Sequence, residues 1–425
     1  MSFRLLCSFF ICSSLLWGQR LSSKRIAREL KKIPAFQQAH VAISISALEN
    51  KKAVASYQEA HYMTPASNVK LLTFLAAKEQ FKKLPAVSYY KENDSLIHFK
   101  TTGYPLLLHP FYSETTLTAF FSQEASFTYH PPSVIPKPLG EGWAWDDYPY
   151  YYAAERSGFP IYGNAVQATF KNNVLDLSPS FFEKNIVMDS LGPKFKRLKA
   201  SNFFTYNPSL WKKGDTLTRP FITSDSLFVK LLSQNIKQEV VLADKTSQEF
   251  PWQKRYLEEE APLYKALLRD SDNGIAESLL LMIGQEAFNE MDVEKVIDSV
   301  LARWNTWLPD AIEWVDGSGV SRYNMITPRT LVSVLQEIHK TVGWETIQNY
   351  FPQGATSGTL KKYTNTAVYA KTGTLRHNHN LSGYLQHNKG TTYVFSIMVN
   401  HHTASTQEVR AGIDTLLEWL DKKLK

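Results

Sequence analysis

Apolar residues recur at helical spacing near both ends of the chain. In residues 22–32, and again in residues 406–424, apolar side chains follow one another every three or four positions. This spacing predicts an amphipathic helix in each segment, and Pro34 ends the first one because proline cannot continue the helical hydrogen bonds. We therefore expect a helix at each end of the mature chain, with one apolar face to bury.

Alternating apolar and polar positions predict strands beside these helices. Residues 41–45 and 53–57 form a predicted hairpin after the first helix, and residues 367–370, 381–387 and 392–399 form three strands before the last helix. Two strands from one end and three from the other can close into one antiparallel sheet covered by the terminal helices. The resulting domain would be split in sequence.

The middle of the chain has a different pattern. Between residues 80 and 249, short apolar runs alternate with Pro, Asn, Asp and Ser, which predicts mostly β structure. Helical spacing returns over residues 257–282. We expect an α+β protein in which residues 21–80 and 255–425 form the split domain. Residues 81–254 would form a mostly β insertion of one or two subdomains.

The first 20 residues have the composition of a secretory signal peptide. Arg4 precedes an apolar run, residues 5–17, that is followed by small or polar residues. Because a spanning helix needs about 20 apolar residues, a cleaved leader is favoured over an uncleaved anchor. Both cysteines of the chain, Cys7 and Cys12, lie in this leader, so the mature chain would contain neither a disulfide nor a cysteine nucleophile. We expect an exported protein of the periplasm or cell envelope.

The net charge narrows the choice of partners. A charge of +7 favours acidic polymers, including cell-wall and membrane surfaces, and leaves open a weak peripheral contact with a membrane. The sequence has no array of interleaved basic and aromatic residues, so nucleic acid is not an expected partner.

Three short motifs occur in the order typical of penicillin-binding proteins and class A β-lactamases. They are Ser67-Asn68-Val69-Lys70, Ser271-Asp272-Asn273 and Lys371-Thr372-Gly373-Thr374. Each is weak alone, because an isolated Ser-Asp-Asn is usually a helix cap and a Lys-Thr-Gly can simply end an edge strand. Their joint presence in this order outweighs those simpler interpretations.

The chain contains a second match to two of these motifs. Another Ser-x-x-Lys begins at Ser88, in a predicted strand, and another Ser-x-Asn begins at Ser233, in the predicted insertion. Ser67 instead precedes an apolar helical run, and residues three apart share a helix face, so the amine of Lys70 should reach its hydroxyl. We take Ser67 as the candidate nucleophile.

The predicted chemistry is acyl transfer to this serine. Lys70 would accept the proton of Ser67, and burial together with a second cation, Lys371, would favour the neutral amine that this step requires. Ser271 would relay a proton to the leaving amine, and Asn273 would hold a substrate amide.

The strand motif would bind the substrate. Lys371 with Thr372 would bind a carboxylate, and Gly373 would let a ligand backbone approach the strand closely. The backbone amides of Ser67 and Thr374 would form the oxyanion hole.

These motifs, with four further segments, resemble those of the low-molecular-mass class C penicillin-binding proteins, the D-alanyl-D-alanine carboxypeptidase/endopeptidase family S13. The further segments are Gly142-Trp143-Ala144-Trp145-Asp146-Asp147, Asp316-Gly317-Ser318-Gly319-Val320-Ser321-Arg322, Gly358-Thr359-Leu360 and Leu381-Ser382-Gly383-Tyr384. The resemblance covers nearly the whole mature chain. It implies a penicillin-binding/serine β-lactamase-like domain, with an antiparallel sheet flanked by helices and a helical subdomain, and no cofactor.

The resemblance also implies a substrate and a class of inhibitor. It implies a serine carboxypeptidase, an endopeptidase or both, acting on peptidoglycan stem peptides through an acyl-enzyme and acylated by penicillins. The family's acidic residue in the Trp-Asp-Asp segment and its arginine after Gly-Ser-Gly are implicated in binding the stem. By this resemblance Asp146 or Asp147, together with Arg322, would determine specificity. The sequence departs from the family at Tyr104, where an aspartate is usual.

Three alternatives stay open. A β-lactamase-like hydrolase is disfavoured because 200 residues separate Lys70 from Ser271, an interval that looks much shorter in class A β-lactamases. A non-catalytic cell-wall-binding protein could retain the same fold. A metallopeptidase would need metal ligands. The candidate histidines lack the helical His pair with an intervening Glu that is typical of such sites, so no metal is expected. These histidines are His377, His379, His401 and His402.

Overall fold

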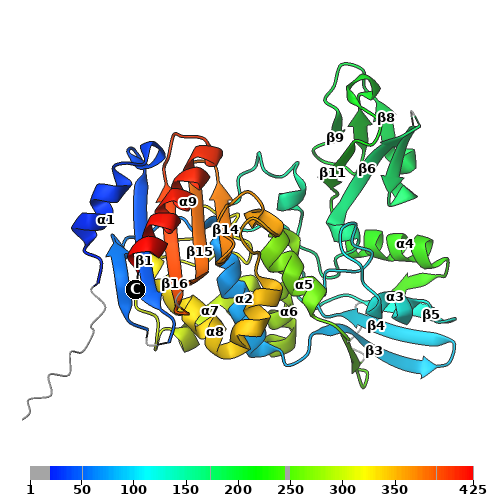
Figure 1. Cartoon of the computed structure of the whole chain (residues 1–425). Coiled ribbons are helices and arrows are strands. Elements are labelled where there is room, and N and C mark those ends of the chain that lie inside the picture. Colours follow the sequence, from blue (N-terminus) through cyan, green and yellow to red (C-terminus); the bar gives the residue numbers. More distant parts are fainter. Residues whose placement is uncertain (1–19, 50, 173, 245–248, 389, 425) are drawn as a thin grey trace, which may run out of the picture.

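The computed structural model describes residues 20–49, 51–172, 174–244, 249–388 and 390–424. Figure 1 shows a body of helices and one large sheet, from which the insertion extends on one side as two lobes. The predicted signal peptide, residues 1–20, lies outside the described residues except for Arg20. No helix of the described residues has the length and apolar character needed to cross a bilayer.

Segments from both ends of the chain form one five-stranded antiparallel sheet (Figure 1), in the order β14-β15-β16-β1-β2. β1 pairs with β16 along its whole length, from His40 opposite Asn400 to Ala47 opposite Tyr393. The first strands of the protein therefore lie beside its last ones. The bounds are β1 (His40–Ala47), β2 (Ala53–Tyr57), β14 (Val368–Leu375), β15 (Asn378–Gln386) and β16 (Thr392–Asn400).

Helices cover both faces of this sheet. Side chains alternate between the faces of a strand, so Ile43 packs against the terminal helices, whereas its neighbour Ala42 belongs to the core on the opposite side. The terminal pair is α1 (Ser23–Leu30) and α9 (Thr406–Lys423), and the opposite face is covered by α2 (Lys70–Gln80) and α8 (Pro328–Tyr350). The predicted antiparallel sheet flanked by helices is confirmed.

A helical subdomain continues from α2 and α8 towards the insertion (Figure 1). It contains α5 (Ala261–Lys265), α6 (Asn273–Phe288) and α7 (Val293–Trp304). A single π-helical turn over 266–270 separates α5 from α6, and Ser271 follows it with a left-handed backbone, φ +63°. Such turns occur frequently at functional sites, and this one ends at the second sequence motif.

The described residues of the insertion form three small sheets. The largest has the order β12-β5-β4-β3-β13, and two three-stranded sheets have the orders β11-β6-β7 and β8-β10-β9. Two helices accompany them, α3 (Thr116–Phe121) and α4 (Asp225–Ile236). The strands are β3 (Pro85–Asn93), β4 (Leu96–Thr101), β5 (Ser126–His130), β6 (Ala165–Lys171), β7 (Val174–Ser178), β8 (Ile186–Met188), β9 (Phe195–Arg197), β10 (Phe204–Tyr206), β11 (Thr216–Pro220), β12 (Val240–Leu242) and β13 (Gln253–Tyr256).

Two element boundaries differ from the sequence-based ones. β14 runs on to Leu375, so the Lys-Thr-Gly motif lies within the strand and does not follow it. Strand β13 ends at Tyr256 and pairs with β3, two residues beyond the predicted edge of the insertion at residue 254. We propose the same division of the chain into a split domain and an insertion, with this edge moved to residue 256.

Candidate active site

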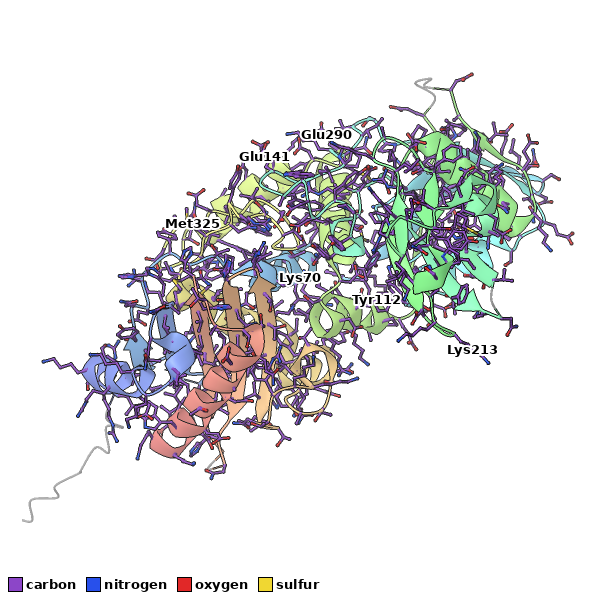
Figure 2. The ribbon with its side chains drawn as sticks, turned by 90° about the horizontal axis from the view of Figure 1, so that it is seen from above. Lys70, Tyr112, Glu141, Lys213, Glu290 and Met325 are labelled. Carbon is purple, nitrogen blue, oxygen red and sulfur yellow. The ribbon has the colours of Figure 1, made fainter. Side chains whose placement is uncertain are left out.

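Ser67 and Lys70 lie where the chain enters helix α2. Ser67 is in a short 3₁₀ turn, Ala66–Val69, and the α-helix begins at Lys70 itself. The prediction that Ser67 begins the α-helix is therefore wrong by one turn, because Ser67 lies in the 3₁₀ turn that precedes the helix. Spacing of three residues still brings the pair together, because Lys70 Nζ donates to Ser67 Oγ over 3.1 Å. Figure 2 shows Lys70 in the middle of the molecule, between the sheet and the helical subdomain.

The amine of Lys70 has three oxygen partners. Besides Ser67 Oγ, it donates to Asn273 Oδ1 over 2.6 Å and to the carbonyl oxygen of Ser318 over 2.7 Å. Neither of these two oxygens can donate a proton. A neutral amine would therefore use its two N–H bonds on Asn273 and Ser318, and its lone pair would face the Ser67 hydroxyl. This arrangement is suited to removing the proton of Ser67.

Burial makes the amine of Lys70 a usable base. The side chain is fully buried, and desolvation lowers the pKa of Lys70 to about 8, against the opposing effect of the Asp316, Glu277 and Asp272 carboxylates. Burial first, and then repulsion from Lys70, holds the pKa of Lys371 well below its ordinary value. The expected second amine thus lies near Lys70, but the pKa of Lys70 is lowered by burial, and three carboxylates that the sequence analysis did not connect with Lys70 oppose that effect.

The lowered pKa of Lys70 predicts that the rate of acylation depends on pH. Only the neutral amine can accept a proton, so the rate of Ser67 acylation should fall as pH decreases through about 8. Stopped-flow measurement of acylation by a chromogenic penicillin between pH 5 and 10 would give the midpoint. A rate that stays constant from pH 9 to pH 6 would contradict the assignment of Lys70 as the base.

The Ser-Asp-Asn motif directs its three side chains to three different places. Ser271 Oγ accepts from Lys371 Nζ over 2.8 Å. Asp272 turns inward and caps helix α6, accepting from the Ile275 amide over 3.0 Å. Asn273 binds Lys70 through Oδ1, and its Nδ2 donates to the carbonyl of Tyr152 over 2.7 Å. The left-handed backbone at Ser271 produces this divergence.

The contacts of Asn273 leave room for the role expected for it. Oδ1 accepts from Lys70 and one N–H of Nδ2 donates to Tyr152, but Nδ2 has a second N–H and Asn273 lines the cleft, so it can still donate to a substrate amide. The contact with Lys70 adds a second use of the side chain, because Oδ1 also holds the amine of Lys70 in place.

The Lys-Thr-Gly motif brings β14 against the serine turn. A Cβ added at Gly373 would overlap the carbonyl oxygen of Pro65, so a larger residue would push the strand away from Ser67. Thr372 Oγ1 donates to Thr359 Oγ1 over 2.9 Å, and Thr374 Oγ1 lies 2.8 Å from His379 Nδ1. These contacts fix the hydroxyl groups of the strand beside the nucleophile.

A cleft of about 610 Å³ opens above these residues. Lys70, Lys371 and Gly373 lie beneath its floor, and the remaining predicted residues line it. At its rim Arg322 Nη1 donates to Asp147 Oδ2 over 3.2 Å, so the two specificity candidates form an ion pair in the unliganded protein. The predicted residues that line the cleft are Ser67, Asp146, Asp147, Ser271, Asn273, Arg322, Thr372 and Thr374.

The competing sequence matches lie elsewhere. Ser88 is buried in strand β3, and Ser233 is in helix α4, so neither lies in the cleft. His379, one of the four histidines weighed as zinc ligands, is held between the hydroxyl groups of Tyr363 and Thr374. Within the part of the chain that the structure describes, no three His, Cys, Asp or Glu side chains are grouped as metal ligands.

A loop after the helical subdomain supports the serine turn from below. Asp316 is fully buried and accepts from the amides of Gly319 and Ser321 over 2.8 and 2.7 Å. Gly319 has φ +82°, and a Cβ there would overlap the carbonyl of Ala66, the residue before the nucleophile. The loop therefore approaches the serine turn closely only because residue 319 has no side chain.

Replacing Gly319 with alanine should displace Ser67 and destabilise the protein. We expect the free energy of unfolding to fall by about 2–4 kcal/mol, combining left-handed strain with overlap, and acylation to slow. Gly214→Ala is the matched control, because Gly214 has φ +86° and open space around it. Calorimetry and acylation kinetics of both variants test this, and equal effects in the two would contradict it.

The family model that matches this sequence is the D-Ala-D-Ala carboxypeptidase 3 (S13) family. It matches residues 22–84 and 133–422, which include all three motifs and the loop at Asp316. The chain belongs to this family. The resemblance inferred from the motifs is confirmed, and the chain is a peptidase-family member whose unmatched segment, 85–132, carries strands β3 to β5.

Individual S13 relatives match over shorter lengths. D-alanyl-D-alanine carboxypeptidase DacB of Haemophilus influenzae is 26% identical over 200 residues, 44% of this chain and 40% of the relative. Penicillin-sensitive carboxypeptidase A of Dictyostelium discoideum is 34% identical over 120 residues, 25% of this chain and 23% of the relative. These sequence matches thus span less than half of the curated relatives.

Solved structures extend the likeness to the whole S13 fold. The crystal structure of penicillin binding protein 4 (dacB) from Haemophilus influenzae has a TM-score of 0.73, with 93% of this chain and 99% of that chain covered. The same protein complexed with a β-lactam has a TM-score of 0.69. At 18% identity this likeness shows the fold, and the predicted α+β penicillin-binding architecture is confirmed.

Proposed function

We propose that this protein is a serine D-alanyl-D-alanine carboxypeptidase or endopeptidase that cleaves peptidoglycan stem peptides through an acyl-enzyme on Ser67. The observation that carries the proposal is the environment of Lys70 Nζ. Two of its partners accept hydrogen bonds only, and the third is the Ser67 hydroxyl at the floor of an open cleft. The carboxypeptidase names of the S13 relatives support the choice of substrate.

The contacts fit a two-step acyl transfer. Ser67 Oγ attacks the carbonyl carbon of the penultimate D-alanine while its proton passes to Lys70, and the backbone amides of Ser67 and Thr374 stabilise the oxyanion. The C–N bond then breaks as the leaving amine takes a proton from Ser271, which Lys371 resupplies over 2.8 Å. Water next attacks the ester, and the proton steps run in reverse to free Ser67.

The cleft has groups for both ends of such a peptide. The hydroxyl of Thr372, on strand β14, would bind the carboxylate of the leaving residue, which Lys371 would attract from beneath the cleft floor. The Asp147–Arg322 ion pair at the rim would bind the stem, with Arg322 taking a carboxylate and Asp146 or Asp147 an ammonium group. Substituting Arg322 should then raise KM for a stem with a free side-chain carboxylate more than for its amidated form.

The site also predicts acylation by penicillins. A penicillin presents a strained amide and a carboxylate at the spacing of a D-Ala-D-Ala end, and the solved relative complexed with a β-lactam supports this reading. We also propose export to the cell envelope, the location of cell-wall substrates.

One experiment tests substrate and intermediate together. The purified mature protein is incubated with penicillin and analysed by intact mass and peptide mapping, which should find one adduct on the peptide containing Ser67. Digestion of purified pentapeptide and cross-linked muropeptides should release D-alanine, cleave cross-links, or both. A protein that binds muropeptides but gives neither adduct nor product would be the non-catalytic wall-binding alternative.

A further inference from the structure

A buried ion pair lies next to the residues that hold Lys70. Arg156 Nε and Nη2 donate to Glu277 Oε2 over 2.9 and 2.6 Å, and the two side chains are 5% and 4% exposed. Arg156 belongs to the insertion, in the chain between β5 and β6, whereas Glu277 lies in helix α6 of the split domain. The pair therefore connects the insertion to the catalytic domain.

One residue links this pair directly to the amine of Lys70. The second oxygen of Glu277, Oε1, accepts from the amide of Ser318 over 2.8 Å. The carbonyl of the same Ser318 accepts from Lys70 Nζ over 2.7 Å. The position of a partner of Lys70 thus depends on Glu277, and the position of Glu277 depends on Arg156.

Arg156 adds a cation to a group of charges around Lys70 in which carboxylates predominate. The carboxylates that act on Lys70 are Asp316, Glu277 and Asp272, and the neighbouring amine is Lys371. These three carboxylates face two amines, of which Lys371 has a pKa held well below its ordinary value, so the guanidinium of Arg156, which does not lose its proton, is the permanent cation of the group. Burial and the nearby Glu277 raise the pKa of Asp316, which is a sign of the excess negative charge that Arg156 offsets.

Arg156 is itself tightly positioned. Its guanidinium lies 5.4 Å from the ring of Trp143, whose Nε1 donates to Asp316 Oδ2 over 2.8 Å. Its backbone amide donates to the carbonyl of Pro138 over 2.8 Å. Trp143 belongs to the segment that carries Asp146 and Asp147. The same segment therefore forms part of the cleft rim and contacts both Arg156 and Asp316 near Lys70.

We propose that Arg156, although it does not touch the substrate, is a positioning residue that controls the charge around Lys70 by neutralising Glu277. The proposal rests on the proposed function, in which Lys70 is the base. It assigns the insertion a part in the chemistry: the insertion provides the cation that keeps the catalytic amine from binding its proton too tightly.

The direction of each effect follows from Coulomb attraction. Without Arg156, the full charge of Glu277 would act on Lys70 and favour the ammonium form, so a higher pH would be needed to free the base. Without the charge of Glu277, Arg156 would act alone and disfavour the ammonium form. Removing both charges should largely restore the original balance.

The test is the pH dependence of penicillin acylation in the full mature chain. The measured quantity is the acidic limb, the pH range over which the acylation rate falls as pH decreases. Relative to the wild type, we expect the midpoint of this limb to move up by at least about half a pH unit in Arg156→Gln, and down by a similar amount in Glu277→Gln. The Arg156→Gln/Glu277→Gln double variant should lie close to the wild type. Arg329→Gln is the matched control, because it removes another Arg-carboxylate pair, with Asp310, and should leave the limb in place.

The outcomes separate this proposal from the proposed function. Slower acylation with an unmoved limb in both single variants, or shifts in the same direction, would reduce the pair to a structural support and overturn the proposal. If Arg156→Gln does not fold, the comparison of Glu277→Gln with the double variant still decides, because their limbs must differ. Absence of any penicilloyl adduct in the wild type would instead overturn the proposed function.

Discussion

Ser67→Ala should form no covalent adduct with penicillin and should lose its peptidase activity by about 10⁴-fold or more. Alanine removes the attacking oxygen and leaves the 3₁₀ turn, the cleft and the contacts of Lys70 with Asn273 and Ser318 in place. Intact-mass analysis after incubation with penicillin measures the adduct, and muropeptide digestion measures the activity.

Two further measurements make the Ser67→Ala result decisive. Thermal unfolding should match the wild type, and reversible binding of a muropeptide should persist, because the rim and strand β14 are unchanged. Ser88→Ala is the control, since Ser88 begins the competing Ser-x-x-Lys match and lies in β3. An adduct that persists in Ser67→Ala and disappears in Ser88→Ala would overturn the assignment of the nucleophile.

Lys70→Met should slow acylation by about 10²–10⁴-fold, the usual contribution of a general base. Methionine retains an unbranched chain of similar length but has no group that accepts the Ser67 proton. The fall in rate near pH 8 should also disappear, because the group that titrates there is gone. The rate of penicilloyl-enzyme formation, measured between pH 6 and 10, tests both expectations.

The same helix provides a control for Lys70→Met. Lys78 lies two turns further along α2 and pairs with Glu260 over 3.1 Å, away from the cleft. Lys78→Met should therefore acylate at the wild-type rate with an unchanged pH profile. If Lys70→Met acylated as fast as Lys78→Met, the base would have to be another group.

The fold could be predicted where the hydrophobic period was strong. The terminal helices and the five strands of the main sheet follow from their apolar spacing, and only boundaries differ. β14 continues through Lys371 to Leu375 because β15 offers it hydrogen-bond partners along its whole length. Such pairing is a tertiary effect, which a local pattern of residues does not contain.

The site could be predicted as far as its motifs reach. Spacing of three residues predicted the contact between Ser67 and Lys70, and the structure places the two more distant motifs beside them. The contacts of individual atoms depended on the fold: no local pattern of residues indicates that Asn273 Oδ1 accepts from Lys70. Glu277 did leave a signal, since it is the one charged residue in the run 275–283, where every other residue except Ser278 is apolar, but its partner Arg156 comes from a distant loop.

The pairing of β1 with β16 has a consequence for when the active site can form during synthesis of the chain. A chain made from its N-terminus contains Ser67 and Lys70 about 300 residues before Lys371, and strand β1 is likewise made long before its partner β16. Contacts this distant in sequence form late. The proposed active site therefore cannot form until Lys371 has been made, so a fragment that ends before Lys371 should not be acylated by penicillin.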